Sequence, residues 1–588
     1  MNHTCFKYLA ALVMVLFTAA AAAQDVVRLQ QFENRTHPQV AYWFLTPHIV
    51  ENGRYLDDFR SMLDKAPYDF YFLDAREGSD FTRLDPMHEV VSNIVALAHE
   101  RNVKVGIRLY RMPLTPLPDN DQEGFLGDCK DRLDRKGRGS CSVSTKFIRH
   151  NQKITDKRVY RVYTFLETEK GFYDPETLRE LDQYDVRVKE DSIDISFEAG
   201  PDSAGHTAFV MAEFLLPAPS NYSPRAVQEA MNFIEAYRDI PLDGVMLDEY
   251  KNWAMIPPWK LMFRFGDVRH RPYSIHLAEQ LERRNGEPAG TTLLNMRFAP
   301  RGRPEVRMKA INDYMDLMRQ GPMNIERAVY DRSAAVFGDD FFMSAHNTFH
   351  NNIEEDEIWN TGLTWWTVPR GYGHTDEKTP LPVQMGVAMA YPANAMYNMY
   401  YDWNGGRFQE KVFTDLCYGV RTHYHAFNDR RWGKALEAPE AYELLNPVEN
   451  TARLLNRFDP ALPDIRLLVI FGQEAVQSWY PDESARGRYD VNDSLEILEK
   501  TEKLWDAGYL NALVSSDLVN NGSLTLDAQN RPVLNGHTFD AVVYLYPQYS
   551  KQPAMDFLER YAANGGKLLL EGDATHDFEG RDLSGWYA

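Results

Sequence analysis

Short apolar segments alternate with amphipathic segments in the first part of the chain. VAYWFL at Val40, YDFYFLDAR at Tyr68 and VKVGIRLYR at Val103 predict buried strands. Residues 87–101, between the second and third of these runs, carry apolar side chains at helical spacing. Strands this apolar that alternate with helices predict a parallel sheet covered by helices.

The alternation returns after residue 221. Ser223-Pro224 predicts a helix start, because Ser can cap the helix and Pro fits its first turn. The further predicted strands are LDGVMLDEY at Leu242, DFFMSAHNTFH from Asp340, LTWWTVPRGYG from Leu363 and NAMYNMYYDW from Asn394. These runs bring the count to seven, and an eighth is expected near residues 372–392 or at TTLLNM from Thr291. The α/β pattern predicts a (β/α)8 TIM-type barrel over residues 36–114 and 222–430.

Two further units interrupt or follow this barrel. Residues 115–221 are at first rich in charge, Gly and Pro and then alternate in β fashion, which predicts an inserted β-rich module. Residues 463–588 repeat strand and helix, which predicts a Rossmann- or flavodoxin-like domain. This domain is expected to be non-catalytic, because it has no Cys at a strand-to-helix turn and no G-x-G-x-x-G loop.

The N-terminus has the features of an export signal. Lys7 precedes an apolar run and an Ala-rich stretch, so residues 1–23 predict a secretory signal peptide and a periplasmic or secreted protein. No later run approaches the roughly 20 apolar residues of a membrane span. Cys129 and Cys141 would close a short loop after export, and the sequence leaves open whether they form a bridge or stay free thiols.

Charge and composition argue against several classes of function. The net charge of -21 argues against nucleic acid as a partner, because phosphate binding needs clustered Lys and Arg. No cofactor motif is found. A catalytic metal is not expected: His423-x-His425 falls in a predicted helix, where this spacing separates the rings, and His346-x-x-x-His350 lacks the Glu of a zinc protease.

The segment LDGVMLDEYKNW carries the clearest chemical signal. Its apolar strand ends in Asp248-Glu249, which predicts two carboxylates at the C-terminal mouth of the barrel, where barrel enzymes hold their active sites. Glycoside cleavage needs a carboxyl group that is protonated at the start, and burial beside another carboxylate favours this state. Glu249 is therefore the predicted general acid/base. The alternative is that Asp248 and Glu249 cap a helix or pair with basic side chains.

From this point the chain resembles a known group of enzymes. The order LDGVMLDEY, GDDFFMSAHNTFH, LTWWTVP, GVAMAYPANAMYNMYYDW and then a Rossmann-like domain is similar to retaining barrel β-galactosidases that carry a trimerisation domain. The resemblance covers roughly residues 222–588. It implies that the acid/base is a Glu after the fourth strand, usually preceded by Asn, where this chain has Asp248.

The resemblance also implies a nucleophilic Glu after the seventh strand, which has no clear equivalent here. Glu377 in YGHTDEKTP and Asp402 in YYDWNGG are the two candidates, with Glu377 preferred; a solvated loop charge is the alternative for each. A partner about 5 Å from Glu249 would imply retention of configuration, and about 6.5 to 9.5 Å would imply inversion.

Sugar sites combine flat aromatic side chains with polar groups that fix orientation. The residues predicted to bind substrate lie near strand ends and include Asp248, where a capping role remains open. They are Asp248, Trp43, Trp253, Trp365, Trp366, Trp403, Arg76, Arg108, His346, Asn347, Arg370 and His374.

The sequence thus predicts an exported glycoside hydrolase that cleaves an oligo- or polysaccharide with paired carboxylates, in the retaining manner that the resemblance implies. The alternatives are a non-catalytic carbohydrate-binding or scaffold protein on a degenerate barrel, and a lyase or transferase that uses the same acid. In the group that the chain resembles, the C-terminal domain builds the oligomer. A homo-oligomer is therefore expected, with buttressing of its own barrel as the alternative role of this domain.

Overall fold

The computed structural model describes most of the chain between residues 38 and 586. For some residues, among them Asp248, His346 and His374, it describes the backbone only. The described ranges are 38–65, 68–75, 81, 84–109, 118–145, 154–248, 270–338, 341–346, 371–376, 380–390, 395–399, 408–427, 439–458, 461–478 and 495–586.

Eight parallel strands form a closed barrel in the order β1-β19-β18-β17-β16-β13-β3-β2. Their order around the barrel is their order along the chain, as in a (β/α)8 barrel. The strands are β1 (Val40–Leu45), β2 (Phe70–Ala75), β3 (Lys104–Leu109), β13 (Gly244–Asp248), β16 (Phe342–His346), β17 (Gly371–Asp376), β18 (Ala395–Met399) and β19 (Thr422–Phe427).

Two of the barrel strands differ from the sequence prediction. The sixth strand is β17, which begins with the last three residues of the predicted strand LTWWTVPRGYG and runs into the region proposed for the eighth strand; residues 363–370 lie outside the described residues. Its alternative, TTLLNM, is in fact part of helix α8 (Ala289–Asn295). The segment with His423 and His425, predicted to be helical, forms the eighth strand, β19.

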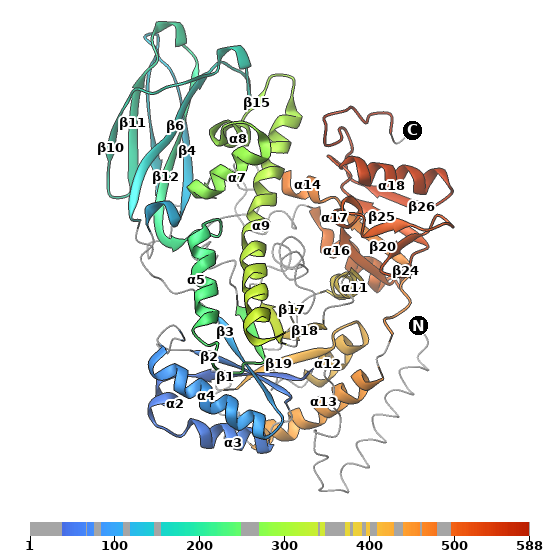
Figure 1. Ribbon diagram of the computed structural model, residues 1–588. Helices are drawn as coiled ribbons and strands as arrows, with labels where there is room; N and C mark the ends of the chain where they lie inside the picture. Colours follow the sequence, from blue (N-terminus) through green and yellow to red (C-terminus); the bar gives the residue numbers. More distant parts are fainter. Residues whose placement is uncertain are drawn as a thin grey trace.

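Helices pack on the outside of the barrel (Figure 1). Ser223 caps α5 as predicted, because its side chain accepts hydrogen bonds from the backbone N–H groups of Arg225 and Ala226. The helices of this part of the chain are α2 (Pro47–Glu51), α3 (Tyr55–Lys65), α4 (Leu84–Glu100), α5 (Pro224–Glu235), α9 (Pro304–Phe337), α11 (Leu381–Ala390), α12 (Phe408–Cys417) and α13 (Pro439–Arg457).

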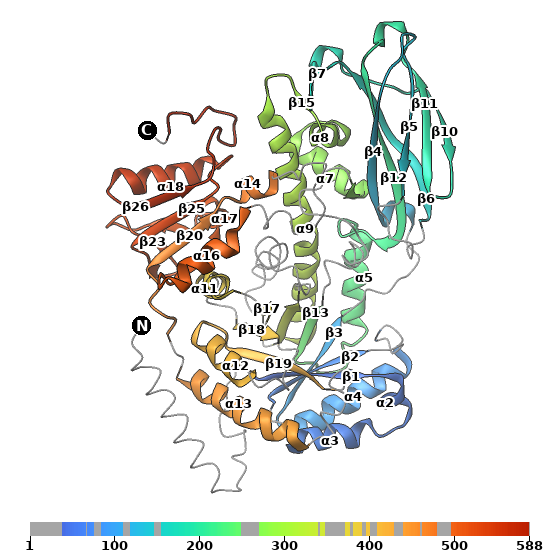
Figure 2. The same cartoon turned by 180° about the vertical axis from the view of Figure 1, so that it is seen from behind.

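The chain between β3 and α5 forms a β-sandwich on the side of the barrel where the strands end (Figures 1 and 2). A sheet of order β14-β4-β12-β6-β9 faces a sheet of order β10-β11-β5 across an apolar core. The strands are β4 (Gln122–Arg132), β5 (Arg138–Ser144), β6 (Asp156–Phe165), β9 (Arg179–Glu180), β10 (Tyr184–Val188), β11 (Ser192–Glu198), β12 (Thr207–Pro219) and β14 (His270–Tyr273). Short elements at its edges are β7 (Glu167–Glu169), β8 (Phe172–Tyr173), β15 (Ala299–Pro300), η2 (Asp119–Asp121), η3 (Pro175–Thr177) and η4 (Pro201–Ser203).

The sandwich extends beyond the predicted boundaries of 115–221. Strand β14, which follows β13 in the chain, completes the larger sheet by pairing with β4. Arg271 of β14 is fully buried and forms an ion pair with Asp128 of β4 at 3.2 Å. Helices α7 (Ile275–Asn285) and α8 pack against the same module. Residues 270–300, predicted as barrel, therefore belong with the sandwich.

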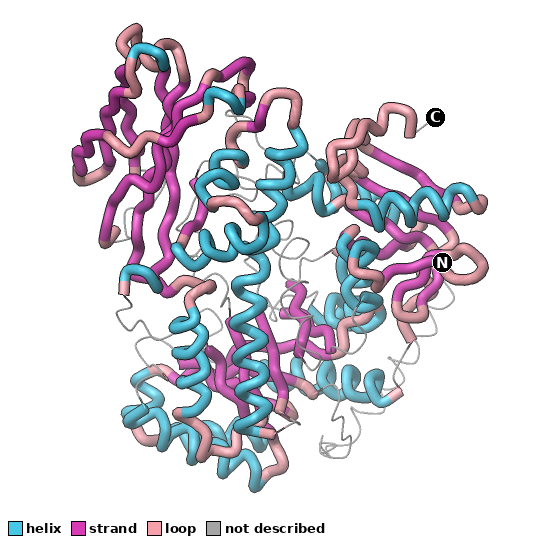
Figure 3. The backbone as a smooth tube through the Cα atoms, turned by 45° about the horizontal axis from the view of Figure 1, so that its top comes forward, coloured by secondary structure: helices cyan, strands magenta, loops and turns pink. Residues whose placement is uncertain are grey.

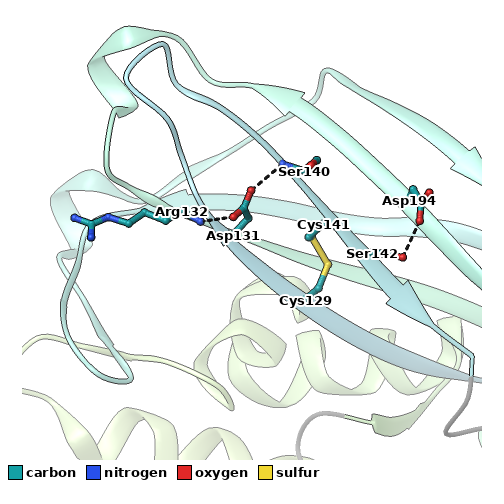
Figure 4. Close-up of a disulfide and its surroundings, with 7 residues drawn as sticks. All are labelled: Cys129, Asp131, Arg132, Ser140, Cys141, Ser142 and Asp194. Carbon is teal, nitrogen blue, oxygen red and sulfur yellow. Dashed lines mark hydrogen bonds between the residues drawn. A yellow bond between two sulfur atoms is a disulfide. The ribbon is translucent and has the colours of Figure 1, made fainter.

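A disulfide joins the two sheets of the sandwich. Cys129 of β4 and Cys141 of β5 are bonded, with their Cα atoms 6.1 Å apart (Figure 4). Nearby, the carboxylate of Asp131 accepts a hydrogen bond from the backbone N–H of Ser140 at 2.9 Å. The bridge lies beside the apolar core of the sandwich and links consecutive strands that belong to opposite sheets.

The C-terminal unit contains a parallel four-stranded sheet of order β21-β20-β25-β26. Numbered along the chain, this order is 2-1-3-4. The strands are β20 (Leu467–Phe471), β21 (Asn511–Ser515), β25 (Ala541–Leu545) and β26 (Lys567–Glu571). The other elements are α14 (Gln473–Ser478), α16 (Ile497–Asp506), α17 (Asp517–Asn520), α18 (Gln552–Ala563) and the antiparallel strands β22 (Leu524–Leu526), β23 (Pro532–Leu534) and β24 (His537–Thr538).

Helices α9 and α11 join the three parts. The long helix α9, which runs through the middle of Figures 1 and 3, packs on α5 beside the barrel, on α7 and α8 beside the sandwich, and on α14 of the C-terminal unit. Asn312 of α9 donates a hydrogen bond to the hydroxyl of Ser478 at 2.7 Å. Helix α11 packs closely on β21, since a Cβ on Gly386 would lie 1.8 Å from the carbonyl oxygen of Leu513. The C-terminal unit therefore buttresses its own chain, and assembly through it stays a prediction.

No helix in the described part of the chain is long and apolar enough to cross a membrane. The predicted signal peptide, residues 1–23, lies outside the described residues.

Candidate functional site

The inside of the barrel is closed at its amino end by apolar side chains. Val40 and Tyr42 of β1, Phe70 and Phe72 of β2 and Met246 of β13 form one buried cluster. Phe70 and Phe72 pack with ring centroids 4.7 Å apart. Such stacked layers make the interior of a TIM-type barrel a packed core, so a ligand can be met only at its carboxyl end.

Two glycines make room for these rings. A Cβ on Gly106 of β3 would lie 2.6 Å from the ring of Phe72, and one on Gly244 of β13 would lie 2.7 Å from the ring of Phe70. Bulky rings on β2 thus fill the volume left by glycine on β3 and β13. A larger residue at either position would force the aromatic layers to shift.

Above these layers the interior becomes polar. Asp74 lies two residues after Phe72 on β2, is fully buried, and forms an ion pair with Arg108 of β3, which is 7% exposed. The guanidinium carbon of Arg108 also lies 5.0 Å from the ring centroid of Tyr42. A charge buried this deeply is stable only with a partner, so Asp74 and Arg108 fix each other at the floor of the mouth.

Arg108 was predicted as a lining residue, whereas Asp74 was not among the candidates. The signal for Asp74 is present in FYFLDA, because strand alternation puts Phe70, Phe72 and Asp74 on one face. An acidic residue that follows two inward aromatic residues marks the layer at which the barrel interior becomes polar.

The structure contradicts the prediction that Trp43 binds substrate. It is fully buried on the outer face of β1, where its ring stacks on Phe59 of α3 with centroids 5.2 Å apart. Its register partner on β2 is Leu73, which belongs to the same layer between strands and helices. Trp43 is therefore part of the packing core and not a sugar platform.

The predicted acid lies directly after the fourth barrel strand. Asp248 is the last residue of β13 and is the register partner of His346, the last residue of β16. The backbone thus brings these two predicted positions side by side at the carboxyl edge, next to β3 with Arg108. Glu249 follows and lies outside the described residues.

The candidates for the second carboxylate follow two different strands. Glu377 comes directly after β17, the sixth strand, and His374 is the register partner of Tyr397 within the β17–β18 pair. Asp402 follows β18, the seventh strand, by three positions. Several predicted residues lie outside the described ranges, namely Glu249, Glu377, Asp402, Arg76, Trp253, Asn347, Trp365, Trp366, Arg370 and Trp403.

Glu123 and Glu474 are buried carboxyl groups with a raised pKa that lie on elements outside the barrel strands. Burial raises the pKa of Glu123, at the start of β4, well above its ordinary value. Burial also raises the pKa of Glu474 in α14, although Lys551 lies 3.4 Å away and opposes the shift. Glu474 accepts hydrogen bonds from Ser516 and Asn520 at 3.1 and 2.9 Å, so it holds together the carboxyl edge of the C-terminal sheet.

No group of three or more His, Cys, Asp or Glu side chains with metal-binding geometry occurs among the residues that the structure describes.

Comparison with known proteins finds similarity in structure only. No protein-family model matches the chain, and no curated protein sequence matches it. A rhamnosidase from Novosphingobium sp. PP1Y aligns with a TM-score of 0.53 at 10% identity, over 93% of this chain and 70% of the rhamnosidase. The two proteins share a fold. A GH42 β-galactosidase from G. stearothermophilus aligns with a TM-score of 0.48 at 8% identity, over 92% of this chain and 73% of that protein. The expected likeness to glycoside hydrolases is therefore confirmed for the fold, and the comparison of folds rests on the rhamnosidase.

Proposed function

We propose that this protein is an exported glycoside hydrolase and that Glu249 is its general acid/base. The observation that carries the proposal is the change in polarity along the inside of the barrel. Aromatic layers fill its amino end, and the Asp74–Arg108 ion pair lies above them beside the end of β13. A barrel that becomes polar only at its carboxyl end has one face suited to chemistry. The shared fold with a rhamnosidase supports glycoside cleavage as that chemistry.

The strand order supports Asp402, rather than Glu377, as the partner of Glu249. The enzymes that the sequence resembles carry their nucleophile after the seventh strand, and the seventh strand of this barrel is β18. Asp402 follows β18, whereas Glu377 follows the sixth strand, β17. This reverses the preference drawn from sequence. With Asp402 as nucleophile the enzyme retains configuration, which the anomeric form of the first product measures directly by NMR.

Export is supported by the disulfide. Structural disulfides persist in oxidising compartments and are rare in the cytosol of most organisms. The Cys129–Cys141 bridge is thus consistent with the signal peptide proposed for residues 1–23. The 2-1-3-4 strand order supports a flavodoxin-like C-terminal domain, which we propose packs against its own barrel without taking part in the reaction.

The acid is tested with Glu249→Gln, which keeps the shape of the side chain and removes the transferable proton. A panel of nitrophenyl glycosides that includes a rhamnoside first identifies the sugar cleaved by the wild type. Rates on an unactivated glycoside should then fall about 100-fold or more, and those on substrates with good leaving groups should fall least.

Glu100→Gln is the matched control. Glu100 is exposed and ends α4, on the side of the barrel where the strands begin, so the same chemical change there should leave activity unaltered. Wild-type rates for Glu249→Gln on an unactivated glycoside would remove Glu249 from the mechanism. Glycan binding without cleavage by the wild type would instead favour a carbohydrate-binding protein.

A further inference from the structure

Strand β10 (Tyr184–Val188) is the outer strand of the smaller sheet of the sandwich. Among the described residues it pairs with β11 alone, and Figures 1 and 2 show it at the edge of the molecule. The backbone N–H and C=O groups on its open side therefore form a template on which a further strand can pair.

The inner face of this edge is apolar. Val186 and Val188 are register partners of Ile195 and Ile193, which are buried in the sandwich core. Yet Val186 is 45% exposed and Val188 is 57% exposed. The core is thus open at this edge, where single chains usually place charged or shielded residues.

The outer face of the same strand is charged. Arg187 lies opposite Asp194 of β11, whereas Asp185 lies opposite the uncharged Ser196. These side chains line one shallow hollow together with Ser140 and Ser142 of β5. β10 therefore presents alternating apolar and charged positions. The acid Asp185 precedes Val186, and the base Arg187 follows it.

We propose that β10 pairs in antiparallel fashion with β10 of a second copy of this chain, about a two-fold axis at Val186. Asp185 of each copy then lies opposite Arg187 of the other, so two ion pairs form by symmetry. On the inner face, Val186 meets its equivalent, and Tyr184 lies opposite Val188 of the second copy. The smaller sheets become one continuous six-stranded sheet.

Charge selects this register. Moving the axis by one residue along the strand keeps each side chain on its own face but places Asp185 opposite Asp185, or Arg187 opposite Arg187. Like charges directly opposite each other in a sheet are destabilising. Centring the pair on Arg187 would also place Asp185 opposite Lys189, but that lysine already pairs with Asp194 of its own chain at 2.5 Å. Within β10, the pairing centred on Val186 is the one that joins opposite charges on the outer face without opposing like charges, and it brings apolar side chains together on the inner face.

Charge reversal tests the pairing with the full mature chain. Sedimentation velocity between about 1 and 100 µM should show a reversible dimer of the wild type, because an interface of one short strand pair is small. Asp185→Arg and Arg187→Asp should each weaken dimerisation by about tenfold or more, since each change makes both ion pairs repulsive. The double variant restores opposite charges and should dimerise like the wild type.

A mixture of the two single variants gives a second readout. In the mixed dimer one copy is positive and the other negative at both positions, so the mixture should dimerise although neither variant does so alone. Asp185 and Arg187 are exposed in the monomer, so both variants should stay folded. Thermal unfolding of Asp185→Arg should match that of the wild type, whereas Arg187→Asp, which puts an acid opposite Asp194, should unfold at a slightly lower temperature.

Cross-linking tests the axis itself. Val186→Cys should form an intermolecular disulfide under mild oxidation, because opposed residues of antiparallel strands have Cα atoms about 4.5–5.5 Å apart. Val188→Cys, which is more exposed than Val186 but lies opposite Tyr184 of the second copy, is the matched control and should cross-link much more slowly. A monomeric wild type, or a dimer unaffected by both single reversals, would overturn the proposal.

Discussion

Removal of the buried cation at the floor of the barrel should destabilise the protein through the carboxylate left behind. In Arg108→Met the side chain keeps its apolar stem but loses its charge, while Asp74 stays fully buried. Loss of one partner from a buried ion pair costs about 3–5 kcal/mol, because the remaining charge stays buried without its opposite charge. For a unit the size of the barrel, about 3 kcal/mol corresponds to a fall of roughly 6–12 °C in the midpoint of thermal unfolding.

The double variant separates the pair from the packing. Asp74→Asn combined with Arg108→Met removes both charges, so the midpoint should recover to within about 2–4 °C of the wild type. Differential scanning calorimetry of the wild type, both single variants and the double variant gives the coupling energy directly.

Arg101→Met is the matched control on the same barrel. Arg101 pairs with Asp64 at 2.9 Å, but the two side chains are 43% and 53% exposed, so the loss should be about 1 kcal/mol or less. If Arg108→Met and Asp74→Asn instead have additive effects, the two side chains are not coupled, and the polar floor described above is wrong.

Two further substitutions test the packing assignments. Trp43→Phe should lower the unfolding midpoint by a few degrees through lost contact with the helix layer, yet leave KM on a cleaved glycoside within about twofold of wild type; a large rise in KM at unchanged stability would return Trp43 to the site. Gly386→Val should loosen the docking of the C-terminal unit, since even a Cβ there would meet the Leu513 carbonyl oxygen at 1.8 Å, and limited proteolysis should then release that unit faster; an unchanged cleavage pattern would show that α11 can move without undocking.

The sequence predicted the barrel where strands are continuously apolar and missed elements whose pattern is weak. β1, β2 and β3 are buried on both faces, as parallel strands are, and apolar runs identify them directly. The same two-sided burial hides which alternate positions face inward, which is why Trp43 was assigned to the wrong face. In β2 the polar Asp74 would have resolved this ambiguity, since its register neighbour on β1 is Phe44 and not Trp43.

Strands that depend on distant partners left little local signal. THYHAF, the eighth barrel strand, is rich in polar residues and falls in a segment that the sequence predicts as helix. HRPY, which forms β14, contains a Pro and two basic residues and becomes a strand only because β4 offers it an edge. The position of Glu249 after the fourth strand follows from the sequence alone, whereas the order of strands that bears on Asp402 required the closed sheet.

Strand β14 also affects the order in which the molecule can be completed during synthesis. The larger sheet of the sandwich is made up to Pro219 before the ribosome reaches His270 of β14. At about 5–20 residues per second this delay lasts on the order of 3 to 10 s. Throughout it β4 has an open edge, and Asp128 still lacks both Arg271 and Arg297, with which it pairs in the described part of the finished fold. Because β13 is synthesised within this interval, the nascent sandwich can close only after the first half of the barrel has emerged.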